Sequence, residues 1–142
     1  MKAVIFVDTS VLLDVLQDDP RWSNWSAAAL DTAAGTDTLA INDIIYAELS
    51  TRYARLERLD AMLAQLTLVH LPMPQPALFL AAKAFLRYRA HGGTKSGVLS
   101  DFFVGAHAAV EGAALVTRDT ARVRAYFPSV RLVSPGDRTG LT

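Results

Sequence analysis

Two aspartates come shortly after apolar runs of the sequence and directly before helical patterns. Asp8 follows the run Ala3–Val7, and Asp119 lies two residues after Thr117, where the run that begins at Ala113 ends. Short runs of this kind predict buried strands. Open parallel sheets bind their ligands at the carboxyl ends of their strands. We therefore expect both carboxylates at a sheet edge where a ligand can bind.

Two further carboxylates lie on predicted helices, at positions that lean toward the interior. Glu48 lies three residues from Ile45, on the flank of an apolar stripe in a helix that begins near Asn42 or Asp43. The members of this stripe are Ile45, Leu49, Tyr53 and Leu56. Asp101 opens another helix, along which Gly105, Ala108 and Gly112 form a line of small residues. A face of small residues lets a helix approach a sheet closely, and it would bring Asp101 inward.

Each of these acids also has an ordinary structural interpretation. Asp8 and Asp119 are suitable helix N-caps, and a first-turn acid such as Asp101 interacts favourably with the helix dipole. Glu48 can pair with Arg52 at a helix surface, for a gain on the order of 0.3 kcal/mol. The combination is more informative than any single acid, because four unpaired carboxylates in one cluster would repel one another.

A hard divalent cation would relieve that repulsion. Ligation by carboxylate oxygens alone points to Mg²⁺ or Mn²⁺. Such an ion can hold a phosphodiester, polarise it and help to deprotonate a water for in-line attack. The pattern therefore predicts metal-dependent cleavage of a phosphodiester, with Asp8, Glu48, Asp101 and Asp119 as the acids that carry it.

Short strands that alternate with helices must position these acids. The predicted strands are Ala3–Val7, Thr38–Ile41, Leu115–Thr117 and Val130–Val133, with Leu68–Leu71 as a weaker fifth. Helical spacing indicates one apolar face with Trp22, Trp25, Ala29 and Ala33, and another with Leu78, Ala81, Ala82 and Phe85, which ends before Gly92 and Gly93. This alternation predicts an α/β fold, a three-layer α/β/α sandwich around a short, mostly parallel sheet.

Composition bounds the class of protein. The chain has 142 residues, of which 51% are hydrophobic, enough for one domain over residues 1–135 with a polar C-terminal tail over 136–142. The absence of cysteine excludes disulfides and thiolate sites. A net charge of zero argues against nucleic-acid binding by bulk positive charge, although residues 61–100 contain no acid and could form a modest phosphate-attracting rim. We find no export signal and no membrane span, and we expect a cytoplasmic protein.

Four segments, in this order, resemble the PIN-domain nucleases, and among them the VapC-type toxins of bacterial toxin–antitoxin pairs. The segments are Val7–Asp14, Ala47–Leu49, Leu99–Ala108 and Leu115–Asp119, and the resemblance extends to about Pro135. It implies a small α/β/α sandwich and an endoribonuclease that depends on Mg²⁺ or Mn²⁺. It also implies an RNA substrate, a cognate antitoxin and a homodimer.

The resemblance also implies roles for individual residues. Asp8, Glu48, Asp101 and Asp119 match the acidic quartet, and Asp8, Asp101 and Asp119 are the expected metal ligands. Ser10 and Thr117 match small polar positions that support the acids by hydrogen bonding. Asp14 belongs to the opening motif, and we expect it to face solvent.

Two other interpretations stay open at this point. Acids at strand ends also suit a metal-dependent phosphatase or phosphotransfer domain, but the Asp-x-Asp pattern of one such class has Ser10 at its second position here. A non-catalytic module could use the same groove to hold a partner. The three histidines are too scattered for a zinc site, and His107 is expected to have a packing or surface role.

Overall fold

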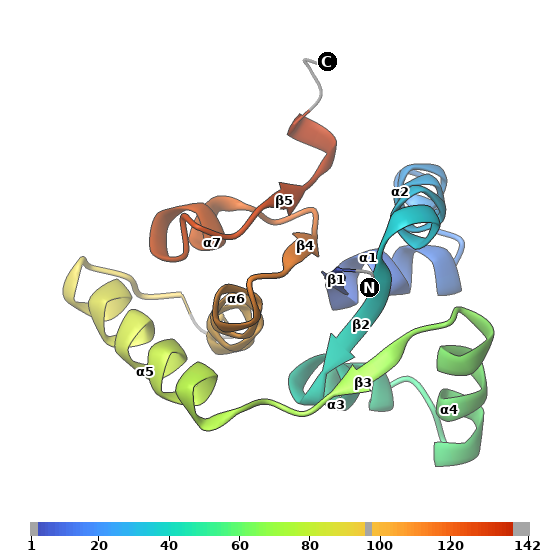
Figure 1. Ribbon diagram of the computed structural model, residues 1–142, viewed down its shortest axis with the longest axis horizontal. Coiled ribbons are helices and arrows are strands. Elements are labelled where there is room, and N and C mark those ends of the chain that lie inside the picture. Colours follow the sequence, from blue (N-terminus) through green and yellow to red (C-terminus); the bar gives the residue numbers. More distant parts are fainter. Residues whose placement is uncertain (1–2, 96–97, 138–142) are drawn as a thin grey trace.

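The computed structural model describes residues 3–95 and 98–137, in which five parallel strands form one sheet in the order β3-β2-β1-β4-β5 (Figure 1). The strands are β1 (Val4–Val7), β2 (Thr38–Asn42), β3 (Val69–Leu71), β4 (Ala114–Val116) and β5 (Leu132–Val133). All five lie where the sequence predicts strands. The expected α/β sandwich with a short parallel sheet is therefore confirmed.

Helices connect the strands and cover the sheet. They are α1 (Thr9–Leu16), α2 (Ser23–Thr36), α3 (Asp43–Ser50), α4 (Leu56–Gln65), α5 (Gln75–Ala90), α6 (Leu99–Glu111) and α7 (Ala121–Tyr126), followed by the short 3-10 helix η1 (Pro135–Asp137). Helix α6 packs against α5 and α7 on one side of the sheet, and α1 packs against α2 on the other (Figure 1). None of the described helices combines the length and the apolar character needed to cross a membrane.

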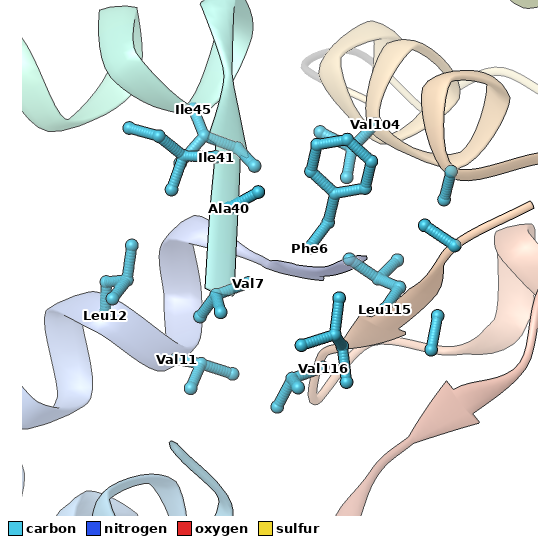
Figure 2. Close-up of a cluster of buried hydrophobic side chains, with 14 of the residues drawn as sticks. Phe6, Val7, Val11, Leu12, Ala40, Ile41, Ile45, Val104, Leu115 and Val116 are labelled. Atoms are coloured by element: carbon cyan, nitrogen blue, oxygen red, sulfur yellow. The ribbon is translucent and has the colours of Figure 1, made fainter. Parts of the chain in front are cut away.

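The central strand β1 is surrounded by the core. Ile5, Phe6 and Val7 are buried, and the Phe6 ring lies 4.6 Å from the His107 ring of α6. Figure 2 shows Phe6 among side chains of α1, β2, α3, β4 and α6. His107 is fully buried, so of the two roles expected for it, packing or surface, it has the packing role. Because the core lies on both sides of β1, the residue that follows this strand is fixed at the middle of the sheet edge.

Two predicted helical patterns differ from the structure. The helix expected to continue from Ile45 to Leu56 ends at Ser50, whose hydroxyl donates to the Tyr46 carbonyl, and α4 begins at Leu56. On α5, the buried stripe is Ala77, Ala81 and Ala84. Of the predicted face, Ala81 is buried and Phe85 packs against the core, but Leu78 and Ala82 are exposed. The interaxial distance of packed helices depends on the side chains at the contact. Small alanines therefore suit the packing against α6, whereas Leu78, Phe79 and Leu86 of α5 are exposed.

Smaller differences concern α2 and α6. The buried face of α2 is centred on Ser26, Leu30 and Ala33, while Trp25 and Ala29 lie on its flank. A Cβ atom on Gly105 would lie 2.6 Å from a carbon of the Phe127 ring, so this glycine makes room for Phe127 rather than for the sheet. Gly112 caps the C-terminus of α6 with φ +63°, a left-handed conformation that favours glycine. Of the predicted tail, residues 136–137 belong to η1, and 138–142 lie outside the described residues.

Candidate active site at the carboxyl edge of the sheet

Asp8 is fixed by the ends of two adjacent strands. The register pairs Val7 of β1 with Val116 of β4, so the next residues, Asp8 and Thr117, lie side by side. The Thr117 hydroxyl donates to Asp8 Oδ2 at 2.7 Å, and the Thr9 backbone N–H donates to Asp8 Oδ1 at 2.8 Å. Asp8 is therefore also the N-cap of α1, as its structural interpretation required. The hydrogen bond expected from Thr117 to an acid of the quartet is present.

The pKa of Asp8 is raised from 3.8 to about 6. Burial is the main cause, and the nearby charges of Asp101 and Glu48 raise the pKa further. The hydrogen bonds from Thr117 and Thr9 act in the opposite direction without compensating. In this environment the ionised form of Asp8 is unfavourable, and a positive charge placed beside it would stabilise that form.

Glu48 reaches the same edge from α3. This helix begins after β2 with Asn42 as its N-cap, whose side chain accepts from the Ile45 N–H at 3.0 Å. The Thr9 hydroxyl donates to Glu48 Oε1 at 2.6 Å, which ties α3 to the first residue of α1. Within the described residues Glu48 makes no ion pair with Arg52, so the surface pairing is not observed. Thr9, which was not among the predicted supporting residues, holds the Glu48 carboxylate here.

Asp101 and Asp119 share one arginine. Arg122 Nη2 lies 2.8 Å from Asp101 Oδ2 and 2.8 Å from Asp119 Oδ2. Burial raises the pKa of Asp101, aided by the charges of Asp119 and Glu48 and opposed by Arg122. Asp119 is not the N-cap of α7, because Thr120 takes that position and Asp119 binds Arg122 instead.

These contacts bring the four predicted acids to one edge of the sheet. Asp8 lies within electrostatic reach of Glu48 and Asp101, and Asp101 within reach of Asp119. Among the described residues, however, no three acidic or histidine side chains are arranged closely enough to hold a metal ion as they stand. Ser10, predicted to support the acids, has a buried hydroxyl without a hydrogen-bond partner in the described structure, so its role stays a prediction.

The donor chemistry of this edge nevertheless fits a hard divalent cation. All four acids offer carboxylate oxygens, the ligands that Mg²⁺ and Mn²⁺ prefer. Arg122 uses Oδ2 of Asp101 and Oδ2 of Asp119, and it uses Oδ1 of neither. The raised pKa of Asp8 indicates where added positive charge would be most favourable.

Asp14 is 4% exposed, so the prediction that it faces solvent is wrong. Its Oδ2 accepts from the Ser26 hydroxyl at 2.8 Å, and Arg118 binds both carboxylate oxygens at 2.8 and 3.0 Å. The Arg118 guanidinium also lies 5.0 Å from the Trp22 ring centre. Arg118 stands between Thr117 and Asp119 in the chain, so this contact ties the loop of two site residues to α1 and α2. The helical spacing of Asp14 from the buried Val11 is a signal that could have found it.

Comparisons with known proteins agree with this description. A family model described as the PIN domain matches residues 5–128. No curated protein matches the sequence. One similar structure is that of VapBC2 from Rickettsia felis bound to a DNA fragment from its promoter. The matched chain has 20% sequence identity to this one, the match covers 92% of this chain and 98% of that chain, and the TM-score is 0.71.

Two other solved structures have similar folds. DNA-bound VapBC from Salmonella typhimurium is 17% identical, covers 94% of this chain and 98% of its own, and has a TM-score of 0.68. FitAcB from Neisseria gonorrhoeae is 22% identical, covers 94% of this chain and 99% of its own, and has a TM-score of 0.65. At sequence identities this low, the comparison shows a shared fold and no more.

Proposed function

The chain belongs to the PIN-domain family, and we propose that it is a divalent-metal-dependent endoribonuclease, the VapC-type toxin of a toxin–antitoxin pair. The observation that carries this proposal is the gathering of Asp8, Glu48, Asp101 and Asp119 at one sheet edge within a PIN domain. Four carboxylates with one shared arginine leave an excess of negative charge. Uncompensated negative charge of this kind destabilises the folded protein, and a bound cation would neutralise it.

Asp8, Asp101 and Asp119 would hold Mg²⁺ or Mn²⁺. When bound, such an ion supplies Lewis acidity toward the scissile phosphate and lowers the pKa of a bound water. Glu48 would act as a general base. The Thr9 hydroxyl donates to its Oε1, and the described hydrogen bonds leave Oε2 free to accept a proton from water. Thr117 and the Thr9 N–H orient Asp8, and Arg122 holds the carboxylates of Asp101 and Asp119 beside each other.

Partners and location form part of the same proposal. The proteins of similar fold include structures named as toxin–antitoxin complexes or systems, which supports a cognate antitoxin for this chain. We also propose a homodimer and a cytoplasmic location, where an RNA substrate is available. The domain of residues 1–135 is proposed to contain all of the nuclease machinery.

Cleavage of a mixed RNA pool by the purified chain tests this function. The reaction is run with Mg²⁺, with Mn²⁺ and with EDTA, beside Asp8→Asn and the control Asp31→Asn, which changes an exposed acid of α2. We expect chelator-sensitive cleavage by the wild type and by Asp31→Asn, and none by Asp8→Asn. Undiminished, chelator-sensitive cleavage by Asp8→Asn would show that the site is assigned wrongly.

A further inference from the structure

A surface of basic and aromatic side chains lies at the C-terminal ends of α5 and α7. We call it the Arg87 surface, and its members are Arg87, His91 and Tyr126. The Arg87 guanidinium lies 5.7 Å from the centre of the Tyr126 ring. The His91 ring stacks on the same ring at 6.1 Å with an angle of 24°, and His91 Nδ1 lies 3.2 Å from the Tyr126 hydroxyl. Arg87 and His91 are exposed and Tyr126 is half-buried, so a ligand can reach all three.

This surface adjoins the acidic edge through α7 and α6. Arg122 and Tyr126 are four residues apart on α7, so they lie on the same face of that helix. Arg122 contacts Asp101 and Asp119, while the Tyr126 ring lies 5.4 Å from the ring of Phe102, the residue after Asp101. Helix α7 therefore connects the acids with the Arg87 surface.

The turn after α5 is held against the protein. A Cβ atom on Gly93 would lie 2.5 Å from carbons of the Tyr88 ring, so only glycine lets the chain pass this closely. The Lys95 N–H donates to the Tyr88 hydroxyl at 3.2 Å, and the Gly93 N–H donates to the Tyr88 carbonyl at 2.9 Å. His91 begins this turn, and its ring is therefore presented from a well-packed support.

The charge of Arg87 is available, in contrast to the arginines closer to the acids. Arg118 is paired with Asp14, and Arg122 is paired with Asp101 and Asp119. Within the described residues Arg87 has no carboxylate partner, and residues 61–100 of the sequence contain no acid that could neutralise it. A free guanidinium is the group that most readily binds a phosphate.

We propose that the Arg87 surface binds single-stranded RNA beside the scissile phosphate. Arg87 contacts a phosphate of the neighbouring nucleotide, and the outer face of the His91 ring stacks on its base. Stacking on aromatic rings together with backbone contacts is how proteins hold single strands without reading their sequence. This inference rests on the proposed ribonuclease function, because it assigns a subsite to the same RNA.

Equilibrium binding in EDTA tests the subsite independently of cleavage. A fluorescein-labelled single-stranded RNA of about 12 nucleotides is titrated with the full chain at pH 8, at several salt concentrations, and gels verify that the RNA stays intact. The variants are Arg87→Gln and His91→Ala, with Arg89→Gln as the matched control. Arg87 and Arg89 lie on opposite flanks of the α5 stripe that contacts α6, since they are two residues apart on a helix.

We expect Arg87→Gln to weaken binding about three- to tenfold and to lower the slope of log K against log salt by about 0.7, the loss of one phosphate contact with a single strand. His91→Ala should weaken binding by a similar factor while the slope stays the same, because stacking releases no counterions. Arg89→Gln should bind as the wild type does. A merely structural role of Arg87 would leave the salt slope unchanged.

Three results would overturn the subsite. They are wild-type affinity and slope in Arg87→Gln, an equal loss in Arg89→Gln, and no measurable RNA binding by the wild type. The subsite and the nuclease can fail separately. If RNA is cleaved but Arg87→Gln binds normally, only the subsite is wrong, whereas selective loss of binding in Arg87→Gln supports the subsite even if no cleavage is found.

Discussion

At the scale of one residue, the ionised carboxylate of Asp8 destabilises the folded state. Its carboxylate is buried at the middle of the carboxyl edge, between the charges of Glu48 and Asp101, and its pKa is raised from 3.8 to about 6. The folded state therefore binds a proton at Asp8 more tightly than the unfolded chain does. Ionised Asp8 destabilises the fold above pH 6, and this penalty disappears as the pH falls below 3.8.

Asp8→Asn is expected to increase the free energy of unfolding at pH 8 in EDTA. The pKa difference corresponds to about 3 kcal/mol, from which we subtract about 1 kcal/mol for the altered bond to Thr117, leaving a gain of about 2 kcal/mol. The gain should shrink steadily between pH 6 and pH 4. Urea unfolding at several pH values measures it, with Asp31→Asn as the control. A pH-independent difference, or a loss of stability at pH 8, would contradict the assignment of an unfavourable charge to Asp8.

At the scale of elements, the ion pair of Asp14 and Arg118 connects α1 and α2 with the loop between β4 and α7. The same loop contains Asp119, one acid of the quartet, and Thr117, whose hydroxyl donates to Asp8, so its position affects both of these acids. Asp14 is almost fully buried, and its carboxylate is satisfied by Arg118 and Ser26. Loss of Asp14 would leave the arginine without its partner.

Asp14→Ala is expected to lower the free energy of unfolding by about 3 kcal/mol, because one member of a largely buried ion pair is removed. Chemical denaturation measures the loss, and Asp31→Ala, at an exposed position of α2, should leave stability unchanged. Arg118→Lys tests the geometry of the pair, since a lysine cannot make the bidentate contact. A change in Asp14→Ala no larger than that in Asp31→Ala would show that the pair does not hold the loop.

The elements also show what could be predicted from the sequence. Short runs such as Val4–Val7 are buried on both sides of a parallel sheet, so their strand character is visible locally. The four acids can be predicted together because strand ends, a helix start and the flank of an apolar stripe are local features as well. The burial of Asp14 was missed because its partner Arg118 is 104 residues away in the chain. The prediction for α5 is wrong at Leu78, because the alanines that pack against α6 are less hydrophobic than the exposed Leu78, Phe79 and Leu86, and hydrophobicity alone favours the larger residues.

At the scale of the whole molecule, the outward face of α5 is apolar over much of its length. Leu78, Phe79 and Leu86 are 41%, 66% and 59% exposed. Several large, exposed hydrophobic side chains on one helix are typical of a protein–protein interface. The proposed homodimer gives them a partner, a second copy of the same chain.

Phe79→Asp is expected to turn the proposed dimer into a monomer while the domain stays folded, because the side chain is mostly exposed within one chain. Light scattering after gel filtration measures the mass, and circular dichroism verifies the fold. Leu56→Asp is the matched control, since Leu56 of α4 is 62% exposed but lies on another helix. A dimer that persists in Phe79→Asp, or that dissociates equally in Leu56→Asp, would locate the interface elsewhere.

Binding of Mn²⁺ to the purified chain, followed by electron paramagnetic resonance, tests the central claim most directly, because it asks whether the carboxyl edge holds a cation without requiring the right RNA. The free-ion signal should fall as wild-type protein or Asp31→Asn is added. It should stay nearly unchanged with Asp8→Asn or Asp101→Asn, each of which removes one charge from the edge. If these two variants bind Mn²⁺ as the wild type does, or if folded wild-type protein binds none, the four acids are not a metal centre and the proposed mechanism is wrong.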